Sequence, residues 1–192
     1  MSLFPFLEVE KDLTRYLRKR EIEGYLIRGK KMSEKAKNAL AIYKSVEGQE
    51  EGVGDWLEID QDRINMFADA TLDHQFIHID PEKSAQLSPY KVTIAHGFLT
   101  LSLIVHLGES VKPLKPEALE GVFMGVNYGL DKVRFPAPVP VNSRVRASHK
   151  FLSAELKGDN TVQVKREVTI EIEGGSKPVC VAESLIRYMY SD

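Results

Sequence analysis

The segment DATLDHQFIHID, residues 69–80, holds the side chains most suited to chemistry. Asp73 and His78 lie five residues apart, a spacing that places them together neither on one helix face nor on one strand face. An irregular loop can nevertheless bring this carboxylate and imidazole together over one water molecule. Such a pair could add water to an activated double bond, because one group removes a proton and the other returns one. The structural alternative is that Asp73 caps a turn and His78 is an ordinary hydrogen-bonded histidine.

A metal site is a second interpretation of the same segment. His74, His78 and Asp80 follow the pattern H-x3-H-x-D, and these side chains suit zinc or iron. However, Ile77 and Pro81 disfavour the continuous helix that would place both histidines on one face. The general base of an HExxH motif is also missing from the sequence. We therefore predict a site with no metal and no cofactor.

His96 and Gly97 come directly before an apolar run. The first turn of a helix presents N–H groups without partners and a positive dipole end, and a glycine there lets a ligand approach closely. Gly97 is thus a candidate for binding a carbonyl oxygen that gains negative charge. The alternative is that Gly97 only allows close packing of the helix on a sheet. We expect His96 to orient the loop rather than to react.

The elements that must position these residues follow from the apolar pattern. Residues 96–111 are apolar on nearly all sides, which predicts a long helix enclosed by the rest of the fold. From residue 121 onward, four β-rich segments alternate with a period of two, and residues 55–59 are a fifth strand candidate. Short turns between long strands favour antiparallel pairing. We therefore predict an α+β fold, with an antiparallel sheet of about five strands wrapped around a long central helix.

The first quarter of the chain has a different character. Residues 1–50 are rich in charge and are predicted to form an N-terminal helical extension, in which Ser33 begins one helix. GQEEGVGD, residues 48–55, is interpreted as a linker, so that 51–192 form the main domain. Within that domain, Asp60 and the Asp80–Pro81 pair are each predicted to begin a helix.

Composition narrows the classes of function. The chain has 192 residues with a formal net charge of −2, which predicts no binding to nucleic acid or to an anionic membrane. One cysteine favours a reducing compartment. The N-terminus lacks the features of a secretory signal, and the longest apolar run is too short to span a bilayer. We expect a cytoplasmic protein.

Three segments in order, DATLDHQFIHIDPEKSA, TIAHGFLTLSL and VNYGLDKVRFPAPV, resemble the MaoC-like dehydratase family, in particular its NodN-like branch. The resemblance spans about residues 52–190. It implies the hot-dog fold, in which an antiparallel sheet wraps a long helix. It also implies a homodimer or a larger assembly of such dimers.

Hydratases of this family carry a Ser-Gly-Asp-x-Asn-Pro-Ile-His pattern followed closely by Asp. The resemblance therefore implies that Asp73 and His78 are the catalytic pair and that the Gly97 amide polarises a thioester carbonyl. Three positions depart from the pattern, with Leu72 in place of glycine and Phe76 in place of proline, while Gln75 replaces asparagine but keeps the amide. The residues expected to support the loop are Gln75, Asp80 and His96.

The activity implied by the resemblance is hydration of a 2-enoyl-CoA, or a related acyl thioester, to the (R)-3-hydroxyacyl product, and the reverse dehydration. No metal or other cofactor is implied. Two alternatives stay open from the residues alone: a non-catalytic acyl-CoA-binding hot-dog protein, and an acyl-CoA thioesterase that would act on the same class of substrate.

Overall fold

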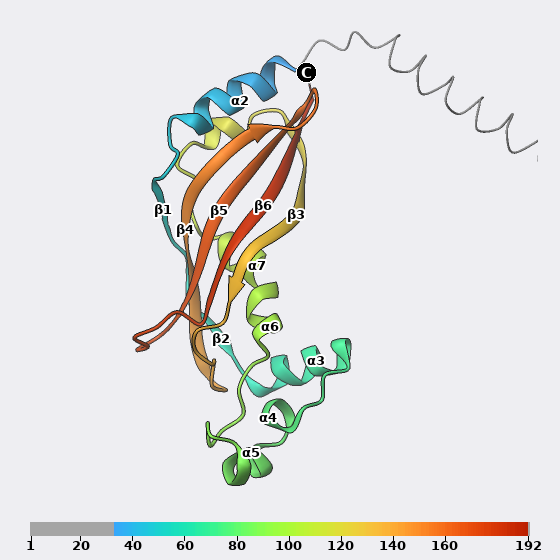
Figure 1. Ribbon diagram of the computed structural model, residues 1–192, viewed down its shortest axis with the longest axis vertical. Coiled ribbons are helices and arrows are strands. Elements are labelled where there is room, and N and C mark those ends of the chain that lie inside the picture. The colour runs from blue at the N-terminus through green and yellow to red at the C-terminus, as the bar shows by residue number, and fades with distance from the viewer. Residues whose placement is uncertain (1–32, 192) are drawn as a thin grey trace, which may run out of the picture. The chain divides into compact units, whose positions relative to one another are not determined.

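A computed structural model describes residues 33–191, which form one antiparallel sheet with helices on one of its faces and at both ends (Figure 1). The strand order is β1-β4-β5-β6-β3, and β2 pairs with β4 beside β1. The sheet thus contains the five predicted strands and one more. The strands are β1 (Glu50–Val53), β2 (Leu57–Ile59), β3 (Val122–Arg134), β4 (Ser143–Leu156), β5 (Thr161–Ile172) and β6 (Cys180–Tyr190).

The additional strand, β1, lies in the segment that the sequence indicated as a linker. Its register on β4 shifts between Glu50 and Gly52, and Gly52 has a φ of 127°, which glycine adopts without strain. A bulged edge strand of this kind has no regular alternation of apolar residues. The periodicity that predicted the other strands was therefore absent here.

Three of the helices begin directly after the capping residues that the sequence predicted. Ser33, Asp60 and Asp80 each accept a hydrogen bond from a backbone N–H in the first turn that follows. The helices are α2 (Glu34–Lys44), α3 (Gln61–Thr71), α4 (Phe76–Ile79), α5 (Pro81–Leu87), α6 (Gly97–Ser102) and α7 (Ile104–Gly108), with a 3-10 helix η1 (Pro116–Leu119).

The central helix differs from the prediction in two ways. It is divided at Leu103 into α6 and α7, and the Ser102 hydroxyl donates to the carbonyl of Leu99, where it competes with the helical hydrogen bonds. It is also not enclosed, since Phe98 is 70% exposed and Val105 is 52% exposed. The sheet covers only one side of an element that is apolar on nearly every side.

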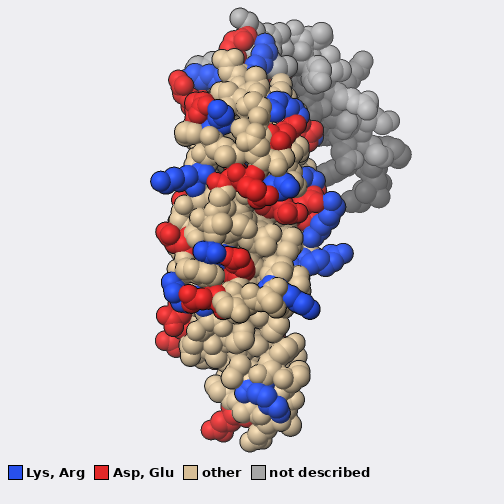
Figure 2. Space-filling view, turned by 90° about the vertical axis from the view of Figure 1, so that its left-hand side faces the viewer, with Lys and Arg blue, Asp and Glu red and all other residues tan. Residues whose placement is uncertain are grey.

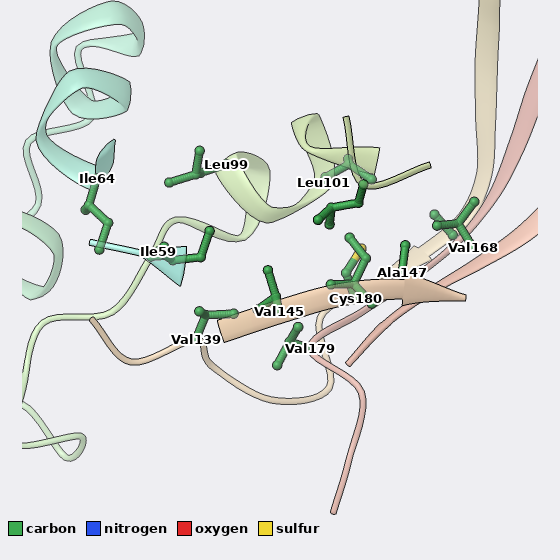
Figure 3. Close-up of a cluster of buried hydrophobic side chains, with 14 residues drawn as sticks. Ile59, Ile64, Leu99, Leu101, Val139, Val145, Ala147, Val168, Val179 and Cys180 are labelled. Carbon is green, nitrogen blue, oxygen red and sulfur yellow. The ribbon is translucent and has the colours of Figure 1, made fainter. Parts of the chain in front are cut away.

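Two hydrophobic cores hold the sheet and helices together. In the first, Leu99 and Leu101 of α6 face strand residues such as Val145, and Ile64 of α3 packs beside them (Figure 3). In the second, α2 packs against β4, where the rings of Tyr43 and Phe151 stack with centroids 5.3 Å apart. The compact unit of the chain therefore begins at Ser33 and includes α2, which the sequence assigned to the extension. Residues 1–32 of that extension lie outside the described residues.

The face of the molecule in Figure 2 carries Lys and Arg side chains interleaved with Asp and Glu. Ion pairs at the surface include Arg144 with Glu173 at 3.1 Å and Lys165 with Asp131 at 2.8 Å. None of the helices within residues 33–191 is long and apolar enough to cross a bilayer.

Candidate active site

A tight turn after α3 presents Asp73. The C-cap of α3, Leu72, has a φ of 62°, in the left-handed region that favours glycine. This is the position at which the family pattern has glycine, and the left-handed backbone angle gives the reason for that glycine. A leucine at such a backbone angle costs about 1–2 kcal/mol, which the surrounding contacts must offset. The turn leaves the Asp73 carboxylate exposed, with one oxygen 3.4 Å from the N–H of Gln75.

The short helix α4 then turns His78 inward, where it is only 7% exposed. The Nδ1 atom of His78 lies 2.7 Å from the carbonyl oxygen of Ile94. Because a carbonyl only accepts hydrogen bonds, Nδ1 carries the proton and the lone pair of Nε2 is free. Burial, and secondarily the neighbouring His96, lower the pKa of His78 below its ordinary value of 6.5, which favours this neutral form.

His96 reaches the same place from the N-cap of α6. Its Nε2 atom donates to the backbone carbonyl of Asp73 at 2.9 Å and so fixes the turn that carries the carboxylate. His96 is therefore bonded to the turn that carries Asp73, and its orienting role stays a prediction. Its Nδ1 atom is buried and has no hydrogen-bond partner among residues 33–191. The rings of His78 and His96 stack with their centroids 3.8 Å apart.

One oxygen of Asp73 and one ring nitrogen each of His78 and His96 all lie within 4.8 Å of one another. Each of these groups can accept a hydrogen bond, so any two of them can hold a water molecule through its two hydrogens. The same three side chains are the ones that could hold a metal ion in the part of the chain that the structure describes. They differ from His74, His78 and Asp80, the set considered as an alternative from the sequence, because His74 binds Asp69 at 2.9 Å and Asp80 caps α5.

Gly97 stands beside this cluster as the first residue of α6. Its N–H has no acceptor inside the helix, because the first turn lacks a preceding carbonyl. A cavity of about 300 Å³ is lined by both Gly97 and His78. A Cβ atom at Gly97 would lie 3.0 Å from the ring of Phe135, so the glycine also lets that ring pack closely against the start of α6. The structure thus brings the predicted carbonyl-binding amide and the predicted acid–base pair to one place.

The remaining supporting residues hold the loop by backbone contacts. Asp80 accepts from the N–H of Lys83 at 2.9 Å, and its own N–H closes α4 on the carbonyl of Phe76. The side chain of Gln75 has no capping hydrogen bond to α4, so its contribution comes through its backbone, whose carbonyl accepts from His78.

Sequence reasoning missed Gln61. Its amide donates to the carbonyl of His78 at 2.8 Å and accepts from the hydroxyl of Thr93 at 2.6 Å. It therefore ties the α4 turn to the segment before α6. No local signal marks this role, because Gln61 lies in the first turn of α3, where a polar residue is ordinary.

A comparison with known families matches residues 44–172 to the MaoC like domain. The chain belongs to the MaoC-like dehydratase family. The family membership inferred from the three motifs is thereby confirmed, and the match begins at the end of α2.

Two curated relatives extend the comparison over most of the chain. A 3-hydroxyacyl-thioester dehydratase Z of Mycobacterium tuberculosis is 48% identical over 151 residues, covering 79% of this chain and 96% of that protein. Nodulation protein N of Rhizobium leguminosarum is 46% identical over 144 residues, covering 75% of this chain and 87% of the relative. This chain is therefore a homologue of a 3-hydroxyacyl-thioester dehydratase and is NodN-like, as predicted.

Among solved structures, an R-hydratase of Pseudomonas aeruginosa superposes with a TM-score of 0.55 at 24% identity, covering 78% of this chain and 86% of that one. At this identity the likeness concerns the fold, and it confirms the hot-dog architecture.

Proposed function

We propose that this protein is an (R)-specific hydratase and dehydratase that adds water across the 2,3-double bond of a 2-enoyl-CoA or a related acyl thioester. The observation that carries the proposal is the convergence of Asp73, His78 and His96 on one point beside the Gly97 amide. The homology to a 3-hydroxyacyl-thioester dehydratase supports the same reaction in the reverse direction. Neither direction requires a cofactor.

In the proposed mechanism, the thioester carbonyl accepts a hydrogen bond from the N–H of Gly97. This draws electron density from C3 and stabilises the enolate that forms during addition. A water molecule donates to the Asp73 carboxylate and to Nε2 of His78, and its oxygen bonds to C3. The water loses one proton to this pair, and the same pair delivers a proton to C2, which collapses the enolate to the thioester.

The protonation states on this site shape the proposal. Nδ1 of His78 keeps its proton in the bond to Ile94, and Nε2 begins without one. In the proposed mechanism neither the Asp73 carboxylate nor Nε2 of His78 carries a proton at the start. The proton delivered to C2 is therefore the one taken from the water. We treat the two groups as a coupled pair, which leaves open which of them is the base.

The experiment that tests the proposal follows the conjugated enoyl absorbance of crotonyl-CoA with purified protein. Wild type should remove it, and Asp73→Asn should lose about 10²–10⁴-fold in kcat, because the amide cannot accept a proton. Asp69→Asn is the matched control, since Asp69 is also exposed but pairs with His74. Turnover by Asp73→Asn at the wild-type rate would refute the assignment.

The alternative functions predict different results in the same assay with crotonyl-CoA. A thioesterase would release free CoA thiol, which a thiol-reactive dye detects. A binding protein would retain the thioester without change and would tolerate the loss of Asp73. A metal-dependent enzyme, with the ion held by Asp73, His78 and His96, would lose its activity with a chelator and regain it with the ion.

We also propose that the protein is a homodimer that pairs through β3. This strand is at one edge of the sheet, and a long apolar edge invites pairing with another chain. Its exposed large apolar residues are Phe123, Met124, Val126, Tyr128 and Leu130. The wild-type mass in solution should be twice that of the chain, and Val126→Lys should shift it toward the monomer. A monomeric wild type at micromolar concentration would contradict the pairing.

A further inference from the structure

His78 is held at two of its atoms, one in the imidazole and one in the backbone. Its Nδ1 atom donates to the carbonyl of Ile94 at 2.7 Å. Its own carbonyl oxygen accepts from the side-chain amide of Gln61 at 2.8 Å. Gln61 is the first residue of α3, whereas Ile94 lies shortly before α6, so the two partners come from separate segments. The imidazole keeps one orientation only while these two segments keep a constant position relative to each other.

Thr93 connects the two segments. Its hydroxyl donates to Oε1 of Gln61 at 2.6 Å, and Ile94 is the next residue of the chain. The hydrogen bonds therefore form a closed path, which runs from the imidazole of His78 through Ile94, Thr93 and Gln61 back to the backbone of His78. Thr93 is only 1% exposed, so solvent does not compete for its hydroxyl. We call these four residues the His78 network.

The amide of Gln61 is fully used in this network. A carbonyl only accepts hydrogen bonds, so the amide nitrogen faces His78 and the amide oxygen faces Thr93. The second hydrogen of the amide nitrogen goes to Oδ1 of Asn65 at 2.9 Å. A methionine of similar length would supply neither a donor nor a comparable acceptor. The network therefore depends on the amide group of residue 61 rather than on its volume.

Backbone hydrogen bonds hold the same segment independently of these side chains. The N–H of Ile94 donates to the carbonyl of Ile77 at 3.0 Å, and the N–H of Val141 donates to the carbonyl of Thr93 at 2.9 Å. Neither bond involves a side chain, so we expect both to survive a substitution at position 61 or 93. What the two side chains add is the link between α3 and the imidazole.

Gln61 and Thr93 can influence the reaction only through His78. Within residues 33–191, the cavity beside Gly97 is lined by His78 but by neither of these two residues. One ring nitrogen of His78 lies within 4.8 Å of an oxygen of Asp73, and in the proposed mechanism both groups bind one water molecule. Groups that act together in this way have to be held within about 0.5 Å of the productive geometry by the hydrogen bonds behind them.

We propose that Gln61 and Thr93 are positioning residues that hold Nε2 of His78 toward the water molecule it shares with Asp73. The proposal rests on the hydratase function and adds two residues outside the catalytic loop. Loss of either side-chain link should lower kcat about 10–100-fold, because a misplacement of about 1 Å costs about 10²-fold. KM should change little, since neither side chain lines the cavity.

Two variants of Thr93 separate positioning from stability. Thr93→Val keeps the shape but removes the hydroxyl, whereas Thr93→Ser keeps the hydroxyl but removes a methyl group. Both should lower the free energy of unfolding, the first because Oε1 of Gln61 loses its donor and the second because a buried methyl group is lost. With crotonyl-CoA as substrate, however, kcat should fall in Thr93→Val alone. Equal kcat values in the two variants, whether at the wild-type level or reduced, would overturn the proposal.

Gln61→Met tests the other side chain of the network. Its kcat should fall as in Thr93→Val, while its KM stays near the wild-type value. Gln163→Met is the matched control, because the amide of Gln163 on β5 also donates to one side chain and accepts from another, Glu155 and Arg187, both at 2.9 Å. A wild-type kcat in Gln61→Met, or an equal loss in Gln163→Met, would overturn the proposal.

A spectroscopic measurement tests the network without turnover. Nitrogen NMR of the His78 imidazole at about pH 7 reports which ring nitrogen carries the proton, and the hydrogen bond to Ile94 selects that nitrogen. Wild type and Thr93→Ser should show a proton fixed on Nδ1, whereas Thr93→Val should show a mixture of the two tautomers. The same spectrum in all three proteins would overturn the proposal.

These measurements separate a failure of the network from a failure of the proposed function. If wild type does not hydrate crotonyl-CoA but the spectra differ as expected, the hydratase function fails and the hold of the network on His78 stands. If wild type hydrates crotonyl-CoA and Thr93→Val matches it in kcat and in spectrum, the function stands and this inference fails.

Discussion

Two polar regions of the molecule satisfy their polar groups in opposite ways: the catalytic loop, and a polar cluster formed by Glu51, His149 and Arg166. In the loop, His78 and His96 each donate a hydrogen bond from one ring nitrogen to a backbone carbonyl, and the other ring nitrogen can contact a ligand. In the polar cluster, Arg166 and Glu51 form an ion pair with each other. A hydrogen bond to the backbone therefore fixes the orientation of an imidazole and leaves its second nitrogen available for chemistry. A side-chain ion pair instead neutralises both of its charged groups.

The largest expected effect is the loss of turnover when His78 of the catalytic loop is replaced. His78→Asn keeps a donor for the Ile94 carbonyl but removes Nε2, so kcat should fall about 10²–10⁴-fold for every chain length. The matched control is His74→Asn, because His74 is exposed and pairs with Asp69. Steady-state kinetics with crotonyl-CoA measure both. If His78→Asn kept the wild-type kcat, the imidazole of His78 would have no part in the mechanism.

The next effect concerns stability and belongs to the polar cluster. Arg166→Met leaves Glu51 buried without its partner, and the free energy of unfolding should fall by about 3–5 kcal/mol. Arg144→Met is the control, because its pair with Glu173 is exposed and should contribute under about 1 kcal/mol. Denaturant unfolding of both variants gives the comparison. If both variants lost the same free energy of unfolding, the buried Arg166 pair would contribute no more to stability than the exposed Arg144 pair.

Much of the fold could be predicted because its signals are local. Ser33, Asp60 and Asp80 each begin a helix as their types indicate, and the period of two marks the four long strands. The loop could be located because its reactive residues lie within one short segment. The meeting of Asp73 with His78 depends on the left-handed turn at Leu72, and a leucine gives no sign of that turn.

The polar cluster could not be predicted, since its members come from three strands. His149 has no acidic neighbour in sequence, and Glu51 lies in the segment interpreted as a linker. Only the pairing of β1 with β4 and of β4 with β5 brings these residues together. The exposed side of α6 and α7 was equally hidden, because an apolar run does not show which side the sheet will cover.

The smallest effect is on the pH dependence of stability, and both regions contribute to it. The pKa values of His78 and His149 lie below the ordinary 6.5 in the folded protein. As the pH falls below 6.5, the unfolded chain binds protons before the folded one does. The free energy of unfolding should thus be full above pH 6.5 and decline below it, by at most about 1.4 kcal/mol per pH unit for each histidine.

Denaturant unfolding of wild type, His78→Asn and His149→Leu between about pH 8 and pH 5 checks this expectation. Each variant should show a shallower decline than wild type. A decline of the same slope in all three proteins would assign the pH dependence to other groups.

The central claim is that Asp73 and His78 act on one face of a substrate whose carbonyl is held by Gly97. Its most direct test is the hydration of crotonyl-CoA in D₂O, with the configuration at C2 and C3 of the product read by proton NMR. The account predicts an (R)-3-hydroxyl and a deuterium at C2 added to the same face. Addition to opposite faces would contradict it, because a single pair on one side of the substrate could not then supply both the hydroxyl and the proton.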